Sequence, residues 1–87
     1  MRQGVFDTPV VVLLPERGSS VRMEVRTPRD AIAAMTRHGL GAYDVTGETW
    51  RSTFTLLVRA SLDPTLQNLG AARIALEVLA SEVSTRH

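Results

Sequence analysis

The residues that decide the fold are two short stretches near the N-terminus, 9–14 (PVVVLL) and 21–26 (VRMEVR). The first is apolar and rich in β-branched residues, and it opens with Pro9 at the strand position where a missing N–H does least harm. The second alternates apolar and charged residues at every step, which is typical of a strand with one face in water. The turn-forming residues 15–20 (PERGSS) join them, so the sequence predicts a β-hairpin.

A symmetrical closure of this hairpin predicts its register and its two faces. The outer face carries Val11 and Leu13 beside Arg22, Glu24 and Arg26, and is therefore half apolar. Burying two such apolar side chains stabilises a fold by about 1.5–3 kcal/mol each, so we expect either the stems of the arginines or a partner to cover them. The inner face is expected to carry six apolar side chains that pair across the strands: Val10 with Val25, Val12 with Met23, and Leu14 with Val21.

The rest of the chain predicts three helices. The first spans residues 28–38, with Thr27 as its N-cap and Gly39 as the left-handed residue after its end. The second spans 47–61, and its stripe of Trp50, Phe54, Leu57 and Val58 is expected to face the core.

The last helix follows the break at Asp63 and Pro64 and reaches about residue 84. We expect the helix to be irregular at residues 68–70. A heptad-like apolar seam runs through it: Leu69, Ala72, Leu76, Leu79 and Val83.

Two strands followed by three helices indicate an α+β fold. We therefore predict one domain over residues 1–87, built as an N-terminal antiparallel β-hairpin followed by three α-helices packed on one face (ββααα). A two-stranded sheet is weak alone and has two open edges, which leaves room for a partner.

The composition narrows the class of protein. The 87 residues contain no cysteine, which excludes disulfides and thiolate metal sites, and no stretch approaches the roughly 20 apolar residues of a membrane span. All ten basic residues are arginine, against nine acidic residues, and we attribute this usage to a GC-rich genome. We expect a cytoplasmic protein without a membrane partner.

No catalytic, cofactor-binding or metal-binding constellation is recognisable, so we expect that the protein is not an enzyme. A hydrolase would have to combine His38 and Asp44 with a hydroxyl from Ser52, Thr53 or Thr55, but no nucleophile elbow or oxyanion loop surrounds these residues. The segment 39–41 (GLG) has two glycines but follows no strand and lacks the rest of a phosphate loop.

Two further features leave alternatives open. Tyr43, Trp50 and Phe54 could line a small-ligand pocket, although an aromatic pair at helical spacing more often belongs to the core. Arg17, Arg22, Arg26 and Arg29 could converge on a nucleic-acid-binding face, although Glu16, Glu24 and Asp30 are interleaved with them.

Several segments resemble the small bacterial proteins grouped as domain of unknown function family 982. They are residues 6–12 (FDTPVVV), the alternating second strand, residues 27–32 (TPRDAI) and residues 72–76 (ARIAL), and the resemblance covers residues 6–82. It implies the fold of a hairpin with helices and carries over no functional residues.

The function that we predict is a small non-enzymatic protein-interaction or self-associating module, which could serve regulation. Its interaction surface would consist of Val11, Leu13, Arg22 and Arg26, and its partner would be a second copy in a homodimer or an unknown protein. The alternative is a nucleic-acid-binding regulatory protein that uses the arginine-bearing hairpin face.

Overall fold

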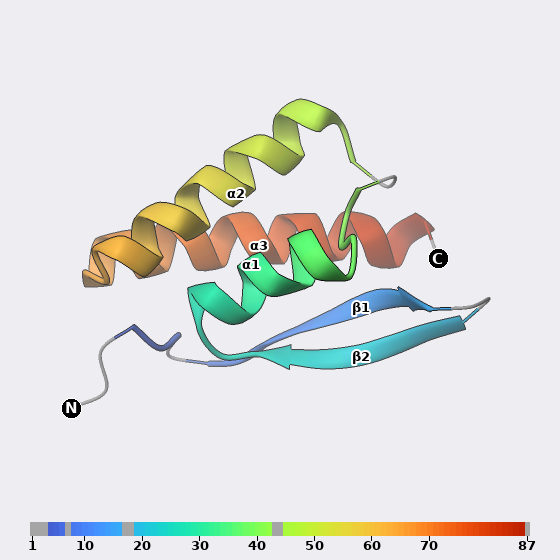
Figure 1. The fold of residues 1–87 in the computed structure, drawn as a ribbon, viewed down its shortest axis with the longest axis horizontal. Coiled ribbons are helices and arrows are strands. Elements are labelled where there is room, and N and C mark those ends of the chain that lie inside the picture. Colours follow the sequence, from blue (N-terminus) through green and yellow to red (C-terminus); the bar gives the residue numbers. More distant parts are fainter. Residues whose placement is uncertain (1–3, 7, 17–18, 43–44, 87) are drawn as a thin grey trace.

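The computed structural model of the chain describes residues 4–6, 8–16, 19–42 and 45–86. A β-hairpin comes first, made of β1 (Val10–Glu16) and β2 (Ser19–Val25), and three helices follow it (Figure 1). The helices are α1 (Pro28–Arg37), α2 (Gly47–Leu62) and α3 (Leu66–Arg86). The predicted α+β class and the order ββααα are confirmed.

The two strands pair antiparallel in the predicted register. Val10 lies opposite Val25, Val12 opposite Met23, and Leu14 opposite Val21. Side chains alternate between the two faces of a strand, and the exposures follow that rule: Val12 is buried, whereas Val11 is 43% exposed. The inner and outer faces of the hairpin are therefore those that the sequence predicts.

Helix α1 begins and ends as its sequence predicts. The hydroxyl of Thr27 accepts a hydrogen bond from the N–H of Asp30 at 3.1 Å, so it satisfies one of the free donors of the first turn. Pro28 stands in the first turn, where its missing N–H removes no helical hydrogen bond. Gly39 follows the cap His38 with φ of +68°, a conformation that other residues adopt only with strain.

Helix α2 buries a narrower face than predicted. Thr53, Leu57 and Ala60 are buried, while Trp50 and Phe54 are only half-buried. Residues four apart are offset by about 40° around the helix, so Trp50, Phe54 and Val58 lie beside the line of Thr53, Leu57 and Ala60 that is fully buried. The predicted stripe is therefore confirmed in part: Leu57 is fully buried and Trp50 and Phe54 pack against the core, whereas Val58 is half-buried and is not part of it.

Among the described residues, helix α3 contributes more buried side chains to the core than any other element. It is continuous from Leu66 to Arg86, so the ragged region expected at residues 68–70 is a wrong prediction. Its first turn is secured by Thr65, whose hydroxyl accepts a hydrogen bond from the N–H of Asn68 at 3.1 Å. The seam predicted for this helix is buried along its whole length: Leu69, Ala72, Leu76, Leu79 and Val83.

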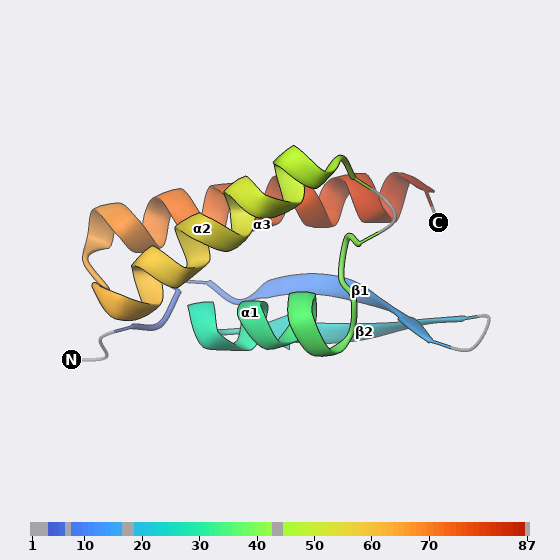
Figure 2. The ribbon, with the colours of Figure 1, turned by 45° about the horizontal axis from the view of Figure 1, so that its top comes forward.

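The elements form layers around one cluster of buried side chains that draws on both strands and all three helices. Helix α3 packs along β1 and α1 packs on β2, while α2 lies over α1 and α3 on the side away from the hairpin (Figures 1 and 2). Arg73 ties α3 to the segment before β1, because its Nε donates to the carbonyl oxygen of Thr8 at 3.3 Å. Among the described residues, no helix has the length and apolarity needed to cross a bilayer.

Candidate interaction surface on the hairpin

The structure brings the four predicted surface residues together on the outer face of the hairpin. Leu13 lies directly opposite Arg22, and Val11 lies opposite Glu24. Arg22 and Arg26 are exposed and Leu13 is half-buried. Val11 remains largely in contact with solvent, so the side chains of this chain do not cover the apolar part of the face completely.

The charges on this face are partly neutralised by an ion pair at the end of β2. A guanidinium nitrogen of Arg26 lies 3.3 Å from a carboxylate oxygen of Glu24, and both side chains are well exposed. An exposed ion pair of this kind contributes at most about 1 kcal/mol to stability. Its larger effect is electrostatic, since Glu24 stands between Arg22 and Arg26 and interrupts the positive potential that a nucleic acid would need.

The outer edge of the sheet is formed by β2. In Figure 1 β2 lies at the margin of the molecule, with β1 between it and α3, while α1 packs against β2 from one side. The hairpin also extends beyond the end of α1, so the inner face is incompletely covered there: Val21 is 42% exposed and Met23 is half-buried. The sequence places both residues on the inner face correctly, but it does not show that α1 ends too early to cover them.

The backbone groups on this edge follow from the hairpin geometry. Two residues separate Glu16 from Ser19, so this pair closes the hairpin as a hydrogen-bonded pair. Hydrogen-bonded and non-hydrogen-bonded pairs alternate from there, which puts Arg22 and Glu24 in non-hydrogen-bonded pairs. Their N–H and C=O groups therefore point away from β1, toward the open edge.

The residues considered for catalysis do not come together in the described part of the chain. His38 is exposed at the end of α1, and Thr53 is buried within α2. Asp44 lies outside the described residues. No group of three or more histidine or acidic side chains in the described residues is arranged to hold a metal ion.

Trp50 and Phe54 form a stacked pair that packs against the core but is only half-buried. The rings of Trp50 and Phe54 stack with their centroids 5.2 Å apart and an interplanar angle of 8°. Nε1 of Trp50 donates to the carbonyl oxygen of Leu40 at 3.1 Å, which fixes the indole. Tyr43, the third aromatic residue considered for a ligand pocket, lies outside the described residues, as does Arg17 of the proposed nucleic-acid face.

The chain was compared with protein-family models, curated proteins and solved structures, and none of them matches. The resemblance to domain of unknown function family 982 therefore stays a prediction.

Proposed function

We propose that this chain is a non-enzymatic, self-associating module, in which the β2 edges of two copies pair to form a four-stranded antiparallel sheet. The observation that supports this proposal is the pattern of residues along the open edge: Arg22 and Glu24 are placed symmetrically about Met23. A two-fold axis perpendicular to the sheet at Met23 makes that edge complementary to itself.

The backbone of this edge suits such pairing. The outward N–H and C=O groups of Arg22 would bond to those of Glu24 in the second copy, and the same pair would form again on the other side of the axis. In this arrangement the helices of both copies lie on the same face of the sheet. Unpaired strand edges are common templates for adding a strand, so the mode of association has a general precedent.

The side chains favour the register centred on Met23 over the registers centred on Arg22 or Glu24. Centred on Met23, the pairing sets Arg22 of each copy opposite Glu24 of the other, and each cross-strand pair of opposite charge contributes about 0.2–1 kcal/mol. Centred on Glu24 it would set Arg22 against Arg26, and centred on Arg22 it would set two arginines against each other. Both shifted registers place like charges opposite one another, which is destabilising.

The apolar residues of the inner face favour the same register. Val21 of one copy would lie opposite Val25 of the other, and the two Met23 side chains would meet at the axis. Val21 and Met23 are the inner-face residues that α1 leaves partly uncovered. The pairing uses one strand edge and few side chains, so we expect a small contact area and weak association.

Sedimentation equilibrium between about 5 µM and 1 mM tests the proposal. The unmodified protein should change from monomer to dimer over this range. Arg22→Glu and Glu24→Arg should each abolish the dimer, because each creates two like-charge pairs across the axis. The double variant R22E/E24R should recover it, since the opposite charges are restored in exchanged positions.

The controls separate the pairing from general effects of charge. Arg51→Glu changes the same charge on the exposed side of α2 and should leave the dimer intact. Glu24→Arg and the double variant share the loss of the Glu24 contact to Arg26, so the difference between them reports the cross-copy pair alone. A protein that stays monomeric up to 1 mM, or a double variant that fails to recover, contradicts the proposal.

Nucleic-acid binding by the arginine-bearing face is the second candidate, and the Glu24–Arg26 pair makes it the weaker one. It predicts retention on an immobilised nucleic acid at low salt that decreases as salt is raised. Such retention, if Arg22→Glu removes it, would replace the self-association proposal.

A further inference from the structure

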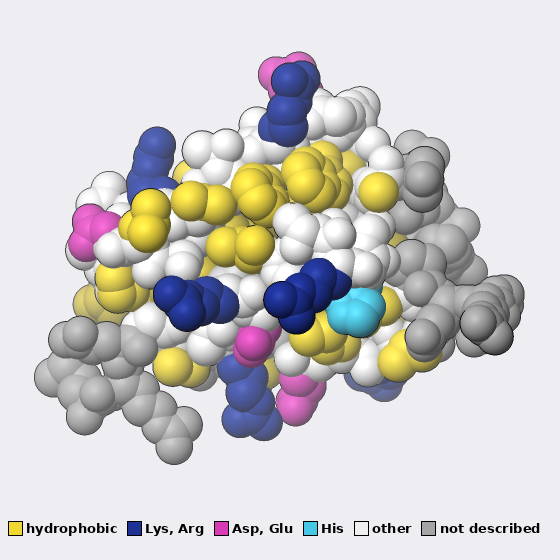
Figure 3. Space-filling model, viewed as in Figure 1, with side chains coloured by type: hydrophobic (Ala, Val, Ile, Leu, Met, Phe, Trp, Pro, Cys, Tyr) yellow, Lys and Arg dark blue, Asp and Glu magenta, His cyan; other side chains and the backbone are white. Residues whose placement is uncertain are grey.

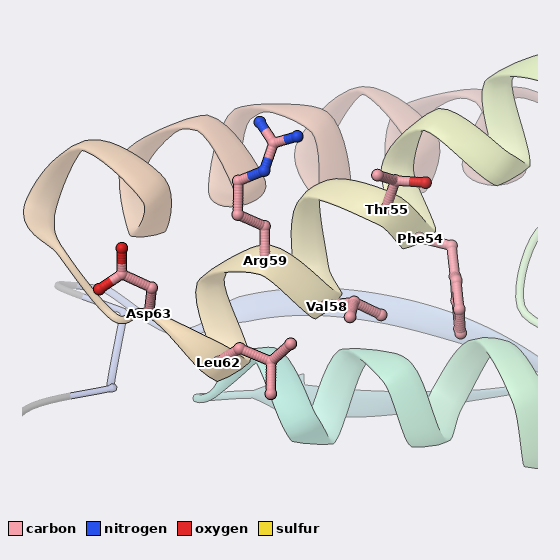
Figure 4. A pocket seen from close by; sticks show the side chains of 6 residues that line it. All are labelled: Phe54, Thr55, Val58, Arg59, Leu62 and Asp63. Atoms are coloured by element: carbon pink, nitrogen blue, oxygen red, sulfur yellow. The ribbon is translucent and has the colours of Figure 1, made fainter.

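A second apolar surface runs along α2, on the side that faces α1. Figure 3 shows it as a band of hydrophobic side chains over α2. Figure 4 shows Phe54, Val58 and Leu62 pointing toward α1, whereas Arg59 points the other way. Together with Trp50, these residues recur at every fourth position. The hollow beside them, called here the α2 groove, has a volume of about 490 Å³ and is lined by Phe54, Thr55, Val58, Arg59, Leu62 and Asp63.

The floor of the α2 groove is apolar, and one end of it is held in place by other side chains. Leu62 is 82% exposed at one end, and Phe54 and Val58 are half-buried. At the other end, Phe54 is held by its stacking on Trp50, and Trp50 is held by its hydrogen bond to Leu40. A fixed aromatic ring at this end lowers the entropy cost of binding, because it does not have to be ordered when a ligand arrives.

Arginines lie on both sides of the apolar band. On α1, Arg29 and Arg37 are exposed but do not line the groove itself, and Figure 3 shows dark blue side chains over α1 beside the apolar band. Arg59 stands on the opposite side of the band. Within the described residues, none of these three guanidinium groups forms an ion pair with a carboxylate. Asp63 is the acidic residue of the lining, at the end of the groove.

We propose that the α2 groove binds an amphipathic α-helix of a partner protein, one that carries acidic residues on both sides of its apolar stripe. The apolar band on α2 runs from Trp50 through the groove to Leu62, and twelve residues of helix span about 18 Å, which matches three to four turns of a partner helix. Helices commonly bind in this way, with apolar anchors every three or four residues. The three arginines set the charge of the partner, since carboxylates on both sides of its stripe would face Arg29 and Arg37 on one side of the band and Arg59 on the other.

A synthetic peptide provides the first test. The probe is a 14-residue helix stapled on its outer side, with leucines on one stripe, glutamates beside them and no tryptophan, and its twin has lysines in place of the glutamates. Trp50 is the single tryptophan of the chain, so its fluorescence reports binding directly. The acidic peptide should change the emission saturably, and the lysine twin should bind at least tenfold more weakly. Equal binding of the two peptides, or no change up to 1 mM peptide, contradicts the proposal.

A matched pair of variants locates the site. Leu62 at 82% exposure and Leu66 at 84% exposure are nearly equivalent, but only Leu62 lines the α2 groove. Leu62→Glu should raise the dissociation constant of the acidic peptide at least tenfold, while Leu66→Glu should change it less than threefold. Equal effects of the two changes would overturn the assignment.

Two further measurements, vesicle binding and peptide binding by a hairpin variant, complete the test. Vesicles of phosphatidylglycerol and phosphatidylcholine probe the other occupant that an apolar strip with arginines could take. Protein that sediments with these vesicles in a Leu62-dependent manner, without binding the peptide, would overturn the proposal. The α2 groove lies on a different element from the β2 edge, so R22E should leave peptide binding unchanged, and the two proposals can fail separately.

Discussion

Nε1 of Trp50 donates a hydrogen bond to the carbonyl oxygen of Leu40 at 3.1 Å, and this contact joins α2 to the segment that follows α1. Leu40 is itself fully buried. The bond therefore anchors a loop residue within the core and at the same time fixes the orientation of the indole ring.

Replacing this indole should test the bond. Trp50→Phe keeps an aromatic ring beside Phe54 but leaves the Leu40 carbonyl without its donor, so we expect a loss of about 1–2 kcal/mol in the free energy of unfolding. Urea unfolding followed by circular dichroism measures it. Leu62→Ala, at an exposed position of the same helix, should change stability by no more than about 0.5 kcal/mol. A loss in Trp50→Phe no larger than that would show that the bond contributes nothing.

Two glycines of one loop provide a matched comparison. Both have positive φ, +68° for Gly39 and +75° for Gly41. A Cβ at Gly39 meets no atom within 4 Å, whereas a Cβ at Gly41 would lie 3.1 Å from a methyl carbon of Leu79. Gly39→Ala should therefore show only the backbone cost of about 1–2 kcal/mol. Gly41→Ala should lose about 1–3 kcal/mol more because of crowding against the buried leucine.

Thermal unfolding of the two alanine variants measures that difference. If Gly41→Ala is no less stable than Gly39→Ala, then Leu79 moves aside freely and the close approach of the loop to α3 is not a packing constraint.

Neighbouring valines in β1 test the assignment of the hairpin faces. Val12 is buried and Val11 is largely exposed. Val12→Ala should lower the free energy of unfolding by about 2–3 kcal/mol, because it removes buried methyl groups and leaves a cavity. Val11→Ala should lower it by less than about 1 kcal/mol. Chemical denaturation of both proteins checks the prediction, and similar losses would mean that the strand is turned differently.

The same comparison can be made on α3. Leu76 is fully buried in the seam, while Ile74, two residues before it, is 64% exposed. Leu76→Ala should cost about 2–5 kcal/mol and Ile74→Ala less than about 1 kcal/mol. Equal midpoints in a urea titration would contradict the position of the core.

The sequence predicts the parts of this fold that depend on local patterns. Alternation in residues 21–26 and the turn before them determine the hairpin, and the sequence Thr27-Pro28 marks the start of α1, because capping and strand periodicity involve only near neighbours. The α3 seam is also predicted, although Gly70 suggested an irregularity there. The helix is continuous at Gly70 because the residues on both sides, Leu69 and Ala72, are buried against the core, and tertiary packing outweighs the low helix propensity of glycine.

The parts that were not predicted depend on how far each element reaches in space. That α1 ends before it covers Val21, and that α2 turns Phe54 and Val58 toward a groove, follow from helix lengths and crossing angles rather than from residue type. The outer face of Val11, Leu13, Arg22 and Arg26 could be predicted because the period of a strand is two residues. The sequence also predicts that the sheet has open edges, but it does not show that α3 packs beside β1 rather than β2.

The packing of β1 against α3 bears on how many copies of the chain can associate. The two edges of the sheet are different, because β1 is flanked by α3 and β2 is not (Figures 1 and 2). A copy that joins through β2 presents its own β1 as the new boundary, so the four-stranded sheet would end in two β1 strands, each packed against an α3 helix. Association through β2 would therefore stop at two copies rather than continue into a fibre, which distinguishes a closed symmetrical pair from open polymerisation.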